Sequence, residues 1–345
     1  MALGDVAGQQ RAVRFLKQLV KKDAIPHAFL FTGMPGTGKL AAAVEFARVL
    51  ECVRPVEFDA CGRCGPCNKI SEGVHPDLIQ VRSDGASIKL DQIRELRERF
   101  RFRPFEGKWR VVIIRDAQKL LEQAANALLK ILEEPPPGNV FILLAPEAQM
   151  LLPTIVSRCC HVRFQPLDDT IVAEFVERQS GLPPDRVAEI ARLSAGSIEK
   201  ARWLTEEDRI AGWTKVVHNL EKLDGLPILD LFQTVSEWAG KAAREDVEQD
   251  LECARLWVRD LILLRTGADH PLTFSISDKT KEAARRVAPE SLFLLYKDIE
   301  QAMQNLKVNA NLQLTLEGVC LAVKDSVYGQ GDWNSFSKGR QDLPL

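Results

Sequence analysis

Four cysteines follow closely on a glycine-rich loop, and this pairing limits the possible folds more than any other feature of the sequence. The cysteines have the spacing C-x8-C-x2-C-x2-C, at Cys52, Cys61, Cys64 and Cys67. Four thiolates within so short a segment suit the closed tetrahedral shell of a structural Zn²⁺. We therefore expect a zinc module over about residues 52–67; the alternative is that these residues are ordinary loop thiols.

Length, charge and cysteine use place the chain among soluble globular proteins. Its 345 residues exceed the usual size of one core and predict two or three domains. A net charge of -2 excludes a uniformly basic surface, so any nucleic-acid contact must be a local patch. No stretch reaches the roughly 18 apolar residues of a membrane span, and the start of the chain has no apolar signal core. We expect a cytoplasmic protein without membrane contact.

The cysteines outside the cluster are expected to be reduced. Thiols stay unpaired in the cytoplasm, which favours small structural side chains over disulfides at Cys159, Cys160, Cys253 and Cys320.

Three short apolar runs predict buried parallel strands, at residues 28–32, 110–115 and 139–145. Helical patterns separate these runs, and the pattern after residue 117 ends at the prolines of residues 135–137. Alternating strands and helices predict a doubly wound α/β domain. After Pro166 only helical patterns follow. The expected domains are therefore an α/β domain (1–165), a small helical unit (166–208), a helical bundle (209–328) and a mobile tail (329–345).

Residues 33–40, GMPGTGKL, carry the pattern G-x-x-x-x-G-K of a phosphate-binding loop. A strand before it and a helix after it supply the context that this loop needs: backbone N–H groups approach phosphate oxygens and a lysine reaches the terminal phosphates. The alternative is a glycine turn with a surface lysine. The nucleotide-binding residues expected here are Gly33, Gly36, Thr37, Gly38, Lys39 and Leu40.

Two positions argue against hydrolysis at this loop. Leu40 stands where a Ser or Thr hydroxyl normally ligates Mg²⁺. Asp116 ends the second apolar run, but Ala117 follows it where an acidic residue would activate water. Loss of a positioned base typically costs about 10²- to 10⁴-fold in rate. We expect ATP or ADP to bind with weakened Mg²⁺ and without useful turnover; Asp116 either caps a helix or keeps a vestigial metal contact.

Several motifs occur together and in order: the phosphate loop within PHAFLFTGMPGTGK, the four cysteines, HPD at residues 75–77, ANALLKILEEPP at 125–136 and SRC at 157–159. With SAGSIEKA at 194–201 and NANLQLTLE at 309–317, the chain resembles the delta-prime family of bacterial DNA polymerase III clamp-loader subunits, which are AAA+ proteins. The resemblance covers about residues 1–325 and is strongest over 26–165.

The resemblance implies a RecA-like AAA+ domain with a zinc-binding insert, a helical lid and an all-α C-terminal collar domain. It implies delta and gamma/tau subunits as neighbours in a ring, and the sliding clamp and primer–template DNA as partners through that complex. It also implies that the arginine of SRC, Arg158 here, acts as an arginine finger in the ATP site of a neighbouring subunit. Without the resemblance, Arg158 would be an ordinary capping or bridging arginine.

Two other functions remain open to test. An active gamma/tau-type motor would need a hydroxyl at residue 40 and an acid at 117, and Leu40 and Ala117 argue against it. A metabolic P-loop kinase would need a polar constellation that the helical second half does not offer. The arginine-rich stretch 93–110 could contact DNA or a partner, but its alternating glutamates are also typical of a solvated helix face.

Overall fold

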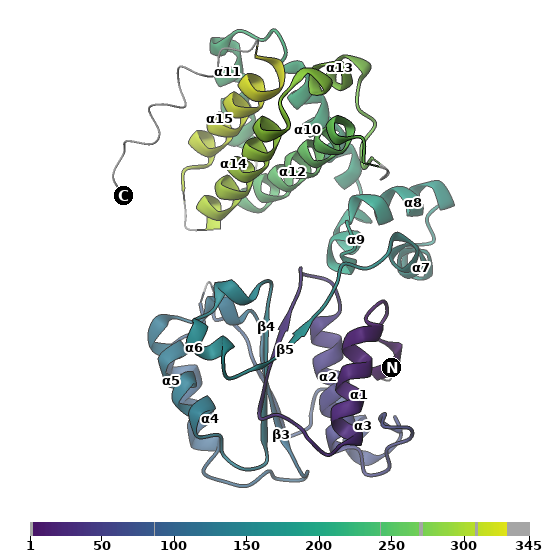
Figure 1. Cartoon of the computed structure of the whole chain (residues 1–345), viewed down its shortest axis with the longest axis vertical. Helices are drawn as coiled ribbons and strands as arrows, with labels where there is room; N and C mark the ends of the chain where they lie inside the picture. The colour runs from purple at the N-terminus through teal and green to yellow at the C-terminus, as the bar shows by residue number, and fades with distance from the viewer. Residues whose placement is uncertain (1–2, 86, 242, 269–271, 308–309, 330–345) are drawn as a thin grey trace. The chain divides into compact units, whose positions relative to one another are not determined.

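The computed structural model describes residues 3–85, 87–241, 243–268, 272–307 and 310–329 (Figure 1). The chain divides into two compact units, residues 1–205 and 206–345. The first unit holds the sheet together with the three helices after it, so the division into separate α/β, lid and bundle domains stays a prediction. The expected mobile tail lies outside the described residues from residue 330 onward. In the described part of the chain, no helix has the length and apolar character for crossing a bilayer.

A five-stranded parallel sheet with the order β2-β3-β4-β1-β5 forms the centre of the first unit. Its strands are β1 (Ala28–Thr32), β2 (Leu78–Val81), β3 (Arg110–Ile114), β4 (Asn139–Ala145) and β5 (Cys160–Arg163). All residues of β1, β3 and β4 are buried, as the continuous apolar runs predict for parallel strands covered on both faces. The sequence therefore placed three strands correctly, although β3 ends one residue earlier than the run 110–115.

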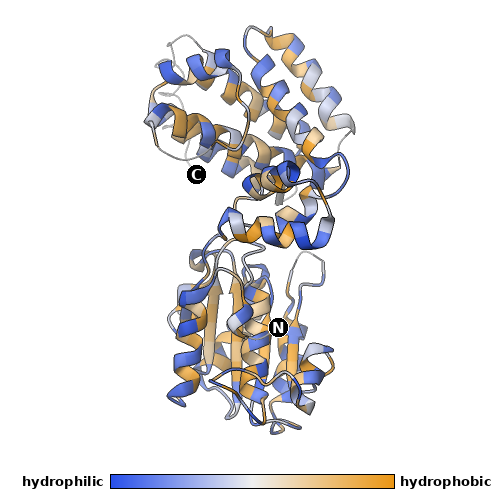
Figure 2. Ribbon diagram, turned by 90° about the vertical axis from the view of Figure 1, so that its right-hand side faces the viewer, coloured by the Kyte–Doolittle hydropathy of each residue, from blue (hydrophilic) through white to orange (hydrophobic). Residues whose placement is uncertain are grey.

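Helices cover both faces of this sheet (Figure 1). One face packs on α1 (Gln10–Lys21) and α2 (Lys39–Glu51), and the ring of Phe29 in β1 meets that of Phe46 at a centroid distance of 5.3 Å. The other face packs on α4 (Leu90–Arg99), α5 (Glu122–Glu133) and α6 (Pro153–Val156). Figure 2 shows the strands in orange between helices whose outer faces are blue. Successive strand residues point to opposite faces, so Phe29 and Leu30 belong to different cores.

Short elements complete the α/β part. They are η1 (Leu3–Asp5), α3 (Gly65–Ser71), η2 (Ala117–Lys119) and η3 (Ala148–Met150). The helical pattern after residue 117 is in fact a 3-10 turn followed by α5. Leu120 and Leu121 are extended between the two, where the Lys119 carbonyl accepts the Ile88 N–H and the Leu121 N–H donates to the Ile88 carbonyl. The sequence reading also missed β5, whose outer position in the sheet leaves only Val162 fully buried along the strand.

Three helices follow β5 within the first unit: α7 (Asp169–Ser180), α8 (Pro184–Leu193) and α9 (Ile198–Leu204). They share an apolar core of Val172, Val176, Val187, Ile190, Ala201 and Leu204. The chain enters and leaves α7 and α8 at one place, because the Leu167 N–H donates to the Gly196 carbonyl at 3.0 Å. This bond holds Gly196, just before α9, next to the segment that follows β5.

All regular elements in the described part of the second unit are helices. It consists of α10 (Arg209–Lys222), α11 (Ile228–Lys241), α12 (Arg244–Thr266), α13 (Asp278–Arg286), α14 (Pro289–Lys307), α15 (Leu312–Val323) and a final π-turn, η4 (Lys324–Tyr328). The long helix α12 packs against α10, α13 and α14, and α15 packs against α11 and α14. Trp213 and Trp257 are its largest fully buried side chains.

A buried ion pair fixes the loop between α4 and β3. The Asp77 carboxylate accepts the N–H groups of Phe105, Glu106 and Gly107 at 2.7, 2.8 and 3.2 Å, and lies 3.5 Å from Arg110 Nε. Burial raises the pKa of Asp77, but these donors and Arg110 outweigh burial and leave the pKa below its usual value. The helix face expected around Glu95 and Glu98 belongs to α4, which ends at Arg99, where the Arg110 guanidinium binds the Arg99 carbonyl at 2.8 Å.

Removal of the Asp77 carboxylate should destabilise the first unit strongly. Asp77→Ala leaves three backbone N–H donors without their acceptor and removes the counter-ion of the buried Arg110 guanidinium, which keeps only its backbone carbonyl acceptors. Breaking a buried pair costs about 3 kcal/mol or more. Urea unfolding should show this loss, whereas Asp84→Ala, whose side chain is 73% exposed, should change stability by less than about 0.5 kcal/mol. Equal effects of the two substitutions would contradict the anchoring role of Asp77.

Candidate functional site

The phosphate loop lies between the carboxyl end of β1 and the first turn of α2. The Gly33 N–H donates to the Pro146 carbonyl at 3.0 Å, so the loop is tied to the end of β4. Gly33 (φ +147°) and Gly36 (φ +76°) occupy backbone regions that other residues rarely adopt. A side chain at Gly33 would also collide with the Phe164 backbone. The glycines are therefore required by this tight loop, whose last residues open a helix N-terminus suited to anions.

Lys39 turns back over its own loop. Its ammonium donates to the carbonyls of Gly33 at 2.5 Å and of Met34 at 2.8 Å, and the Thr37 hydroxyl donates to Met34 at 2.9 Å. Burial lowers the pKa of Lys39 to about 8, while the carboxylates of Glu199 and Asp116 raise it. A bound phosphate would have to replace the two carbonyl contacts of the ammonium.

The two positions that argued against hydrolysis have apolar surroundings. Leu40 is half-buried and packs on the apolar cluster that α2 forms with the sheet. Ala117 is buried, and Asp116 before it has an exposed carboxylate 3.8 Å from the Lys119 ammonium. Asp116 stands at the N-cap of η2 in a left-handed conformation, yet its side chain makes no capping hydrogen bond. The capping interpretation of its side chain was therefore wrong.

Gln9 is a part of this region that sequence reasoning missed. Its buried amide donates to the carbonyls of Thr37 at 3.1 Å and Gln165 at 2.7 Å and accepts from the Gln165 N–H at 3.1 Å. The side chain thus connects the phosphate loop to the segment that leads into α7. In the sequence, Gln9 is only the polar residue before an amphipathic helix, and nothing near it predicts these long-range bonds.

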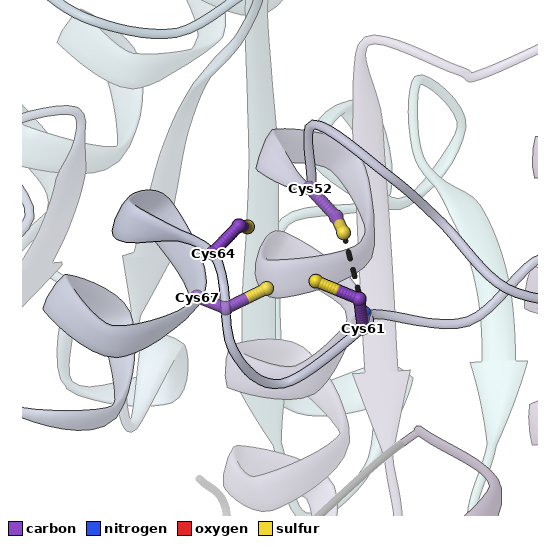
Figure 3. A group of neighbouring side chains, drawn as sticks. All are labelled: Cys52, Cys61, Cys64 and Cys67. Carbon is purple, nitrogen blue, oxygen red and sulfur yellow. Dashed lines mark hydrogen bonds between the residues drawn. The ribbon is translucent and has the colours of Figure 1, made fainter.

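The four cysteines come together beside α2 (Figure 3). Cys52 ends α2, Cys61 lies in the following loop, and Cys64 and Cys67 open α3. All four sulfur atoms lie within 4.8 Å of one another, and the Cys61 N–H donates to Cys52 Sγ at 3.2 Å. A tetrahedron of Zn–S bonds of about 2.3 Å has edges of roughly 3.8 Å. Small side-chain movements would close these sulfurs around such an ion, so the cluster fits a metal.

The environments of the four thiols differ. Backbone N–H groups, first that of Arg63, lower the pKa of Cys61 to about 6, and burial raises the pKa of Cys67 to about 12. Burial also raises the pKa of Cys52. At Cys64 burial opposes the backbone donors, of which Cys67 is the strongest, but the donors prevail and the pKa is lowered. Backbone donors to sulfur are a feature of thiolate sites. The other four cysteines are buried or half-buried, and none of the eight forms a disulfide in the described structure.

Arg158 lies in the turn between α6 and β5, on the face of the sheet that α5 covers. Its guanidinium pairs with Glu133 Oε1 at 2.9 Å and donates to the Thr154 carbonyl at 3.0 Å. The side chains of Arg158 and Glu133 remain 36% and 44% exposed. Glu133, at the end of α5, was not foreseen as its partner. The pair orients the guanidinium without burying it.

The expected site residues therefore form three groups in the first unit. The loop residues 33–40 and Asp116 meet at the carboxyl end of the sheet, where Asp116 acts on the charge of Lys39. The cysteines form a separate cluster beyond α2, and Arg158 belongs to the opposite layer, with α5 and α6.

Comparison with known proteins gives a consistent set of relatives. A family model described as "DNA polymerase III, delta subunit" matches residues 8–168. The chain is 30% identical over 321 residues to DNA polymerase III subunit delta' of Bacillus subtilis. The aligned part covers 92% of this chain and 96% of that protein. It is also 28% identical over 338 residues to DNA polymerase III subunit tau/gamma of Haemophilus influenzae, covering 91% of this chain but only 48% of that longer protein.

Among solved structures, a DNA polymerase III gamma subunit-related protein of Thermotoga maritima aligns at 18% identity over 91% of this chain and 98% of that one. The TM-score of this alignment is 0.45. The match to the Bacillus subtilis protein is different, because it extends over nearly the full length of both chains. On that match the chain belongs to the family of DNA polymerase III delta' subunits.

Proposed function

We propose that this chain is a non-motor subunit of a bacterial DNA polymerase III clamp loader, which acts in DNA replication in the cytoplasm. It joins gamma/tau and delta subunits in a ring, reaches the sliding clamp and primer–template DNA through that complex, and helps to load the clamp. The observation that carries the proposal is the oriented, solvent-accessible guanidinium of Arg158, in a chain whose own phosphate loop has Leu40 in place of a metal-binding hydroxyl.

The parts of the fold take the corresponding roles. The sheet with its phosphate loop is the RecA-like AAA+ domain, α7 to α9 are the lid, and the helical second unit is the collar that joins the ring. This assignment is supported by the parallel strand order and by the position of the loop at the carboxyl end of β1.

Arg158 suits the role of a trans-acting cation. A planar guanidinium matches the charge spread over a transferring phosphoryl group, and such arginines are worth about 10³- to 10⁵-fold in rate. Its contact with Glu133 is solvent-exposed, and exposed pairs contribute only about 0–1 kcal/mol. Glu133 and the Thr154 carbonyl can therefore hold the side chain ready and release it to a stronger anion at little cost.

The chain's own loop is proposed to bind ATP or ADP without useful hydrolysis. Gly36, Gly38 and Lys39 supply the backbone and the cation for phosphate contact. Leu40 offers no oxygen to Mg²⁺, and the segment after β3 offers Ala117 where a base would stand. Pro146 follows β4, so the end of this neighbouring strand brings a backbone carbonyl to the loop.

The cysteine cluster is proposed to hold a structural Zn²⁺. When bound, the ion would supply a cross-link between the end of α2 and α3. Cys52, Cys61, Cys64 and Cys67 fill all four positions of a tetrahedral shell, so no open position remains for catalysis.

The arginine role is tested in a reconstituted ring with gamma/tau and delta subunits. Arg158→Ala should cause a large loss of clamp- and DNA-stimulated ATP turnover, because the served site loses about 10³-fold or more. Arg178→Ala, at an exposed arginine of α7, serves as a control and should have no such effect. Lys39→Ala in this chain should change turnover less than about twofold. If Lys39→Ala removes most turnover, the chain is itself a motor of the gamma/tau type.

The metal site is tested by elemental analysis and thermal unfolding. The purified chain should contain about one zinc per molecule, and Cys64→Ser should lose it together with thermal stability, because a closed shell of four ligands stabilises the folded loop. Cys160→Ser should retain both. A Cys64→Ser variant with full metal content and an unchanged melting temperature would rule out the cluster as a zinc site.

The charge of Lys39 predicts a pH dependence of ADP binding. Only the protonated ammonium attracts phosphate, so the Kd should be nearly constant below pH 8 and rise by up to about tenfold per unit above the pKa of about 8. Titration calorimetry from pH 7 to 10 measures this profile. Lys39→Arg, which keeps its charge throughout this range, should abolish the break near pH 8. A wild-type Kd that stays constant up to pH 10, as the ordinary lysine pKa of 10.5 would give, would contradict the buried environment.

A further inference from the structure

The first residues of α9 lie directly on the phosphate loop. The Ile198 N–H donates to the Gly36 carbonyl at 3.1 Å. A Cβ atom placed on Gly36 would lie 2.7 Å from the Glu199 backbone nitrogen and 2.9 Å from the Glu199 Cβ. Only glycine at position 36 allows this approach, which places Glu199 against the tip of the loop.

Two further contacts hold the start of α9 in this position. The Ser197 hydroxyl accepts the Lys200 N–H at 3.1 Å and so caps the helix. On the other side, the Gly196 carbonyl accepts the Leu167 N–H at 3.0 Å. Gly196 itself has no room for a side chain, because a Cβ there would lie 2.6 Å from the Leu167 nitrogen. The backbone of Glu199 is thus fixed relative to the loop, while its side chain is exposed.

The charges around the loop favour a nucleotide with fewer phosphate groups. Lys39 is the cation of the loop, and the carboxylates of Glu199 and Asp116 both act on it. A triphosphate brings more negative charge than a diphosphate, and it adds this charge at the terminal phosphate that the loop lysine must reach. A carboxylate on the lid side of the loop repels that additional charge and competes for the same ammonium.

We propose that Glu199 is a specificity-determining residue, whose carboxylate makes this phosphate loop prefer a nucleoside diphosphate to a triphosphate. The inference rests on the proposed nucleotide binding by loop 33–40 and adds a preference to it. A diphosphate then serves as a structural ligand between the α/β part and α7 to α9, and the chain holds it without a cycle of triphosphate binding and hydrolysis.

The test compares ADP and ATP binding to the full-length chain in Mg²⁺ at low salt, by titration calorimetry. Wild type should bind ADP more tightly than ATP. Glu199→Gln should shift the ratio of the two Kd values toward ATP by about three- to tenfold, mainly through tighter ATP binding, and Glu199→Arg should shift it further. The shift should shrink as salt rises, because the charge is exposed.

Glu177→Gln is the matched control, since Glu177 is an exposed glutamate of α7 in the same lid. This variant should keep the wild-type ratio, and all variants should keep the wild-type melting temperature. Wild type that binds ATP as tightly as ADP, equal changes in both Kd values for Glu199→Gln, or no binding of either nucleotide would each overturn the proposal. The Arg158→Ala result in the ring is independent of these outcomes, so a failure here is distinguishable from a failure of arginine donation.

Discussion

The place of β1 between β4 and β5 is the constraint on which the rest of the first unit depends. Parallel pairing with β4 brings the Pro146 carbonyl to the Gly33 N–H, and pairing with β5 brings the Phe164 N–H to the Thr32 carbonyl. These bonds fix the start of the phosphate loop, at Thr32 and Gly33. They also fix the segments on either side of it: the turn that carries Arg158 runs into β5, and the chain after Phe164 leads to the lid helices.

The two layers of helices separate two chemical roles. The layer of α1 and α2 contains the loop proposed to hold phosphate, and the layer of α5 and α6 contains the guanidinium proposed to act elsewhere. Because the sheet lies between them, a change in one role need not disturb the other. Loss of a hydroxyl at position 40 costs the chain nothing in folding, since Leu40 packs on an existing apolar cluster. The proposed lack of hydrolysis and the proposed role of Arg158 are therefore compatible in one fold.

Local patterns in the sequence predicted the parts of the fold that depend on local order. β1 and β4 match the apolar runs residue for residue, and the cysteine spacing predicted a cluster that the fold does assemble. Apart from the side-chain cap expected at Asp116, the misses involve distant partners. β5 was missed because it is an edge strand with polar residues at alternate positions. Gln9, Glu133 and Glu199 acquire their contacts only in the folded chain.

The Lys39 ammonium is hydrogen-bonded within its own loop, and these bonds stabilise the loop conformation. Lys39 satisfies its buried ammonium with two carbonyls of its own loop, and α9 satisfies the Gly36 carbonyl. Burial nevertheless lowers the pKa of the ammonium, which indicates that these neutral acceptors compensate its lost hydration only in part. An anion with two or more charges would compensate it further. The proposed binding of a nucleotide without hydrolysis agrees with this charge balance and with the missing hydroxyl at Leu40.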